Sequence, residues 1–140
     1  MHAEYNKIRK EDNMNLSGFE TINLVSGKDT MTVSNDGISF SQATIVQLGK
    51  PEYVKAMINE GSKQFAIQVV DSNEPAKIPF FKRKRKNINV RWNNSVLKNE
   101  LSGMMNWDLQ SYTYRIDGKY YKEDQLMMFD LDKAKKNPRK

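Results

Sequence analysis

The chain of 140 residues has no cysteine and only one histidine, His2. The absence of cysteine excludes disulfides, thiol nucleophiles and cysteine-ligated zinc or iron–sulfur centres. His2 lies in a polar leader that is not expected to hold it in a fixed geometry, so histidine-based triads, proton relays and metal sites are not expected either. These absences argue against an enzyme and against a metal or other cofactor.

Long apolar runs and the common catalytic motifs are also absent. No stretch approaches the roughly 18 apolar residues that a membrane span requires, and residues 1–16 lack the apolar centre of a signal peptide. There is no P-loop, dinucleotide-binding glycine motif or zinc-protease motif. Acids near predicted strand ends are interpreted as solvated groups rather than catalytic pairs: Asp71, Glu74, Asp130 and Asp132. We therefore expect a soluble cytoplasmic protein with neither a membrane partner nor a small-molecule substrate.

Positive charge is abundant but unevenly distributed. The chain has 23 basic and 17 acidic residues, a net charge of +6. Residues 77–91 carry seven basic side chains and no acid, and residues 133–140 carry five more, so the rest of the chain is net acidic. We call residues 77–87 the basic linker and 133–140 the basic tail. Such a concentration of charge attracts polyanions, nucleic acid first, although a solvated loop and tail are the alternative interpretation.

The pattern of apolar residues predicts an α+β, mostly β, fold. Ser41 and either Asn93 or Asn94 are expected to cap short helices over 42–48 and 95–101. Turn signals are Asn35-Asp36-Gly37, Asn59-Glu60-Gly61 and Asp117-Gly118. Alternation predicts strands at 21–25, 31–33, 38–40, 53–58, 62–70, 88–92, 112–116 and 125–131.

Two segments repeat the order strand, short helix, hairpin, which indicates an internal duplication. Ile38-Ser39-Phe40 matches Val90-Arg91-Trp92, and Phe65, Ile67 and Val69 match Met127, Phe129 and Leu131. One unit is too small to bury its own sheet, so two copies are expected to pack as a pseudo-dimer, with a homodimer as another route. The predicted organisation is a polar leader (1–17), a first unit (18–76), the basic linker, a second unit (88–132) and the basic tail. Chance similarity between two small units is the alternative.

The first unit, from Met31 through Asn35-Asp36-Gly37 and Leu48-Gly49 to Val70, resembles the swapped-hairpin domain of the AbrB/MazE-like regulators and antitoxins. Residues 38–81 also resemble small uncharacterised proteins of Firmicutes mobile elements. The first resemblance implies a tandem, degenerate swapped-hairpin fold that binds DNA, and the second implies a phage or mobile-element origin. The family grips DNA with Arg and Lys around the short helix, whereas residues 35–49 contain no basic residue here.

Because that family surface is uncharged, any DNA contact must come mainly from the linker. The candidate nucleic-acid-binding residues are Lys82, Arg83, Lys84, Arg85, Lys86, Arg91 and Lys98. Phe80 and Phe81 precede this cluster and are expected to anchor it to the core, with stacking on bases as the alternative. Lys and Arg without a helical pattern would bind phosphates and carry little sequence information.

Aromatic residues are dense in the second unit. Trp92 alternates with Val90 and is expected in the core. Core packing is also the favoured role of four tyrosines that are alternatively candidates for a protein interface: Tyr112, Tyr114, Tyr120 and Tyr121.

Two functions follow. The first is a small DNA-binding transcriptional regulator or antitoxin-like protein that contacts phosphates through the basic linker. The alternative is a non-enzymatic, phage-encoded inhibitor of a host nuclease, of the anti-CRISPR type, that acts through protein–protein contacts.

Overall fold

The structure, a computed structural model, describes residues 17–18, 27–83 and 87–139. Most of the leader, the strand predicted at 21–25, and Lys84, Arg85 and Lys86 lie outside the described residues. The strands are β1 (Thr30–Ser34), β2 (Gly37–Phe40), β3 (Tyr53–Asn59), β4 (Gln64–Val70), β5 (Ile78–Pro79), β6 (Val90–Trp92), β7 (Tyr112–Tyr121), β8 (Leu126–Asp130) and β9 (Lys135–Pro138). The helices are α1 (Gln42–Gln47) and α2 (Ser95–Met105), and short 3₁₀ turns are η2 (Lys122–Asp124) and η3 (Leu131–Lys133).

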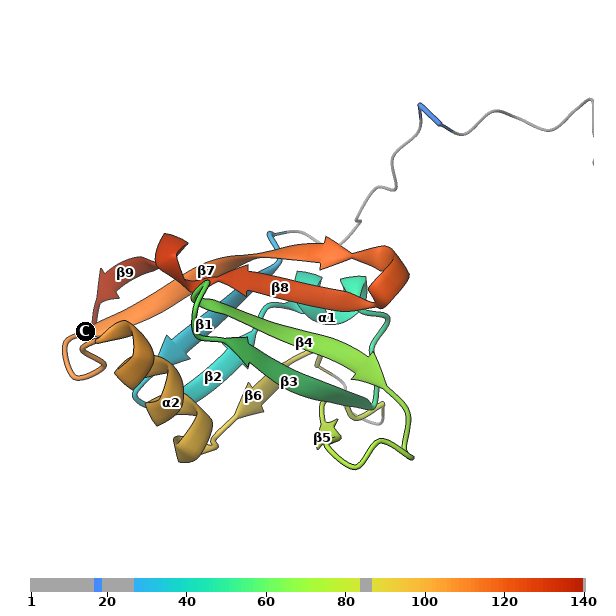
Figure 1. Cartoon of the computed structure of the whole chain (residues 1–140), viewed down its shortest axis with the longest axis horizontal. Coiled ribbons are helices and arrows are strands. Elements are labelled where there is room, and N and C mark those ends of the chain that lie inside the picture. Colours follow the sequence, from blue (N-terminus) through green and yellow to red (C-terminus); the bar gives the residue numbers. More distant parts are fainter. Residues whose placement is uncertain (1–16, 19–26, 84–86, 140) are drawn as a thin grey trace, which may run out of the picture.

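The strands form one antiparallel sheet in the order β5-β3-β4-β8-β7-β1-β2-β6, and β9 continues the line of β8 along the same edge of β7. The sheet curls into a half-barrel, with β3 and β4 on one side and β1, β2 and β6 on the other (Figure 1). The predicted α+β, mostly β, class is confirmed. Strands from the two halves of the chain are interleaved in the sheet. β4 of the first half pairs with β8 of the second, and β1 lies between β2 of its own half and β7 of the second.

The concave face of the sheet holds the hydrophobic core. Alternate residues of each strand point inward, among them Met31 and Val33 on β1 and Phe65 and Ile67 on β4, which are fully buried. The predicted core position of Trp92 is confirmed, because its ring packs edge-to-face on Phe40 at 5.0 Å between ring centroids. A single shared core therefore joins residues from both halves of the chain.

Both predicted helix caps are present. The Ser41 side chain accepts a hydrogen bond from the Thr44 amide at 3.2 Å, and the Asn94 side chain accepts from the amides of Val96 and Leu97. The second helix runs to Met105, beyond the predicted end, and stops where Asn106 adopts a left-handed conformation. α1 follows β2 and α2 follows β6, and because these strands are antiparallel the two helices leave opposite ends of the pair. No helix among the described ranges is long and apolar enough to cross a membrane.

The turn predicted at Asp117-Gly118 is wrong, because β7 runs straight through it. The chain reverses instead at η2, where Gln125 takes a positive φ of 50°. Gly118 is needed for packing rather than turning: a Cβ there would lie 2.8 Å from both Met127 Sδ and Phe129 Cε1. β7 can continue because β1 pairs with it up to Asp117 and β8 pairs with it from Gly118 to Tyr121.

Candidate nucleic-acid interface

The first described end of the basic linker is anchored in the core. Phe80 and Phe81 are only 6% and 4% exposed, and their amides donate to the carbonyls of Glu52 at 2.8 Å and Pro51 at 3.0 Å. The predicted anchoring role of the two phenylalanines is confirmed. Lys82 and Arg83 follow directly and are exposed, so the linker leaves the barrel with both cations facing solvent.

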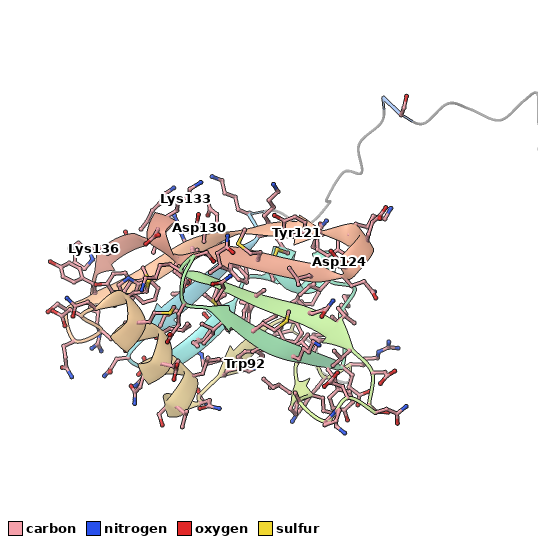
Figure 2. The ribbon with its side chains drawn as sticks, in the orientation of Figure 1. Trp92, Tyr121, Asp124, Asp130, Lys133 and Lys136 are labelled. Carbon is pink, nitrogen blue, oxygen red and sulfur yellow. The ribbon has the colours of Figure 1, made fainter. Side chains whose placement is uncertain are left out.

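The second end of the linker returns to the barrel at β6. There Arg91 is exposed, while its neighbours Val90 and Trp92 are buried. The Trp92 indole N–H donates to the carbonyl of Pro79 at 3.3 Å, which ties β6 to β5 across the open seam of the sheet. Trp92, the last residue of β6, is labelled in Figure 2. Both ends of the linker are thus held by buried aromatic residues close to the same seam.

Two further lysines lie at this end of the molecule. Lys50 directly precedes Pro51, whose carbonyl accepts from Phe81, and it is exposed. The carbonyl of Lys28 accepts a hydrogen bond from the Ser41 hydroxyl at 2.9 Å, which brings this lysine next to the start of α1. They are the basic residues nearest in sequence to the uncharged stretch 35–49, and the Phe81–Pro51 hydrogen bond holds Lys50 beside the linker.

A hollow of about 540 Å³ opens beside the linker. It is lined by aromatic and basic groups together with one acid, Glu52, and one proline: Glu52, Tyr53, Pro79, Phe80, Phe81, Lys82 and Arg83. The Lys77 ammonium lies 5.4 Å from the centre of the Tyr53 ring and also donates to the Ser72 carbonyl at 2.8 Å. An aromatic ring rimmed by cations can accept a planar group next to a phosphate.

Lys98 lies on a helix rather than on the linker or a strand. It lies on α2, is half-buried, and its ammonium donates to the Asn35 carbonyl at 3.1 Å, on the turn between β1 and β2. That turn precedes the start of β2. Phe40, at the other end of β2, pairs with Val90, which follows the linker in sequence. Lys98 therefore supports the β1–β2 turn, which adjoins the Trp92 end of β6.

Three of the four candidate tyrosines pack inward. Tyr114 is buried, stacks on Trp107 at 4.5 Å between centroids and accepts a hydrogen bond from the Asp108 amide at 3.0 Å. Tyr112 and Tyr120 are half-buried and pack against the core, and the Lys136 ammonium covers the Tyr112 ring at 4.5 Å. Tyr121 is 38% exposed and lies near Asp124, far from Lys136 in Figure 2. The favoured core role thus holds for three tyrosines, and Tyr121 alone has the exposure of an interface residue.

One carboxylate is clearly perturbed. Asp29 begins the turn into β1, its Oδ1 atom is buried without a hydrogen-bond partner among the described residues, and desolvation by burial raises its pKa above the usual value of 3.8. Within the described part of the chain no group of three or more acids and histidines could hold a metal ion.

Sequence reasoning missed two exposed cations on the outer face of the sheet, Arg115 and Lys135. Arg115 alternates with the buried Tyr114 and Ile116, a pattern that signals an outward position, but its cross-strand neighbours depend on register.

Comparison with protein-family models, curated proteins and solved structures finds no match to this chain.

Proposed function

We propose that this protein binds the phosphate backbone of DNA and acts as a small regulator or antitoxin-like protein of phage or mobile-element origin. The observation that carries the proposal is the pair of anchors on the basic linker. Buried Phe80 and Phe81 at one end and Trp92 at the other fix where Lys82, Arg83 and Arg91 meet the solvent. Fixed cations lose less conformational entropy on binding a polyanion than cations on a free chain would.

The strand pairing supports a tandem, swapped-hairpin-like pseudo-dimer. β2 pairs with β6 about Ser39 opposite Arg91, which are matched residues of the proposed duplication. β4 pairs with β8 about Ala66 opposite Met128, which are also matched. β1 lies beside β7 as β5 lies beside β3, whereas the β1–β2 pairing has no β5–β6 counterpart among the described residues. The β2–β6 and β4–β8 pairings agree with a pseudo-two-fold axis that passes through these two strand pairs, close to the linker.

The test is binding of a mixed-sequence DNA duplex as a function of salt, measured by fluorescence anisotropy. Replacing the five residues Lys82 to Lys86 with alanine should reduce the slope of log affinity against log salt concentration by up to about 4.5, since each lost phosphate contact removes about 0.9 from the slope. The smaller variant K82A/R83A is compared with K119A/K122A, which removes the same charge from exposed positions of β7 and η2. No binding by the unaltered protein at low salt would disprove the proposal.

A second candidate function is inhibition of a host nuclease by direct contact, and one observation favours it. Tyr121 lies on the outer face of the sheet opposite Leu126, and Met128, two residues further along β8, is on the same outward side. Exposed tyrosine beside adaptable methionine is typical of protein interfaces. Affinity capture from nuclease-treated host lysate discriminates the two functions, because only a protein partner would survive the treatment in stoichiometric amount.

A further inference from the structure

Five residues form a continuous row across the outer face of the sheet. Arg91 on β6 is directly opposite Ser39 on β2, and Ser39 is opposite Thr32 on β1. Thr32 is opposite Arg115 on β7, which is in turn opposite Lys135 on β9. Directly opposite residues in an antiparallel pair point to the same side of the sheet. The strand neighbours of Thr32, Ser39, Arg91 and Arg115 are buried in the core, so the row faces outward.

The row is basic at both ends and polar between them. Arg91, Arg115 and Lys135 are exposed, and the hydroxyl side chains of Thr32 and Ser39 are partly exposed. Within the part of the chain that the structure describes, no side-chain hydrogen bond or ion pair engages any of the five. Other cations are committed elsewhere: Lys136 covers Tyr112, Lys119 covers Tyr121, and Arg139 donates to backbone carbonyls.

The chemistry of the row matches a phosphate backbone. Most protein–DNA hydrogen bonds go to phosphate oxygens, from Arg, Lys, Ser and Thr side chains among others. Four strand-to-strand steps of about 4.8 Å give the row a length of roughly 19 Å, long enough to contact several phosphates. The nearest acid along β7 is Asp117, two residues from Arg115 and on the same face. The row itself contains no acid.

We propose that this outward row, Arg91-Ser39-Thr32-Arg115-Lys135, is a second phosphate-contacting surface that extends the linker site across β2, β1, β7 and β9 on the same DNA duplex. The inference rests on the proposed DNA binding. Arg91 joins the two surfaces, because it follows the linker in sequence and begins the row in space. The duplex would therefore lie across the strands, with one end of the contact at the linker and the other at β9.

The experiment measures binding of a labelled duplex of about 30 base pairs by the full chain, with salt varied between roughly 50 and 200 mM. The variant R115A/K135A should weaken binding about fivefold or more and reduce the salt slope by about 2, one for each lost contact. The control K119A/K122A removes the same charge from η2 and from the same strand, four residues from Arg115, and should change affinity less than about twofold. Asp117→Asn should strengthen binding, because it removes the acid nearest the row.

The outcomes separate this inference from the proposed function. If the linker variants lose affinity but R115A/K135A binds as the unaltered protein does, the row is not a contact and the inference is overturned. Equal losses for R115A/K135A and K119A/K122A would also overturn it, because only net charge would then matter. If R115A/K135A weakened the binding of single-stranded RNA but not of duplex DNA, the assignment to duplex DNA would be overturned. The variant R115Q/K135Q is measured as well, and a melting curve is recorded for each variant. A variant that melts as the unaltered protein does has not lost affinity through loss of fold.

Discussion

The carboxylate of Asp29 lies where the chain enters β1, and burial without a partner disfavours its charged form. Its pKa is raised in the folded state above the unfolded value, so its favourable contribution to stability is complete below the unfolded pKa. That contribution is lost as pH rises through the higher folded pKa. At neutral pH the ionised, desolvated carboxylate therefore opposes folding.

Asp29→Asn should consequently raise the melting temperature at pH 7 by a few degrees. The gain over the unaltered protein should shrink as pH falls and vanish near pH 3, where Asp29 is protonated in both states. Thermal denaturation followed by circular dichroism at several pH values measures this, with the exposed turn residue Asp36→Asn as the matched control. A gain that is independent of pH would show that charge is not the cause.

The short helix α1 depends on one side chain. The Ser41 hydroxyl accepts from the amides of Thr44 at 3.2 Å and Thr30 at 3.0 Å, and donates to the Lys28 carbonyl at 2.9 Å. It thereby joins the helix start to the first strand. A helix of six residues has few internal hydrogen bonds of its own, so it relies on such contacts.

Ser41→Ala should cost about 1–2 kcal/mol of unfolding free energy, the range measured for loss of a helix N-cap. Urea denaturation gives the value. Ser62→Ala is the control, because the Ser62 hydroxyl is exposed and donates only to the neighbouring Gln64 side chain at 3.0 Å. A cost for Ser41→Ala no larger than for Ser62→Ala would show that the network does not stabilise α1.

Local patterns predicted the elements well where short-range chemistry decides. The caps at Ser41 and Asn94 and the alternation in β2 and β4 were correctly interpreted, because caps and half-buried strands depend on neighbours in sequence. The prediction failed at Asp117-Gly118, because β1 pairs with β7 up to Asp117 and β8 pairs with it from Gly118 onward, so that β7 continues through the site. Likewise, the basic tail contributes β9, whose pairing with β7 no local pattern indicated.

At the level of the whole chain, the two halves share one sheet rather than standing as separate bodies. β1 lies between β2 and β7, β4 pairs with β8, and β2 pairs with β6, so three pairings join strands from either side of the linker. The apolar side chains of both halves also fill one core. Each half alone would expose its inner sheet face to water, at a large cost in free energy.

A protease site inserted after Arg83 should therefore yield a nicked protein that remains one particle. Its two fragments should co-elute from a gel-filtration column in native buffer at the volume of the intact chain, and unfold in a single transition. The isolated fragments should be unfolded by circular dichroism. Separation of two folded fragments in native buffer would contradict this and would favour two independent units.

The sequence by itself determined the charge asymmetry, most helices and strands, and the inward positions of Phe80, Phe81 and Trp92. These features follow from composition, periodicity and capping, which act over a few residues. Only the tertiary structure decided which cations share a surface. Lys98 binds the β1–β2 turn, while Arg91, Arg115 and Lys135 came into one row. The reason is physical: strand register is set by how a curled sheet closes around its core, and that closure joins residues far apart in the chain.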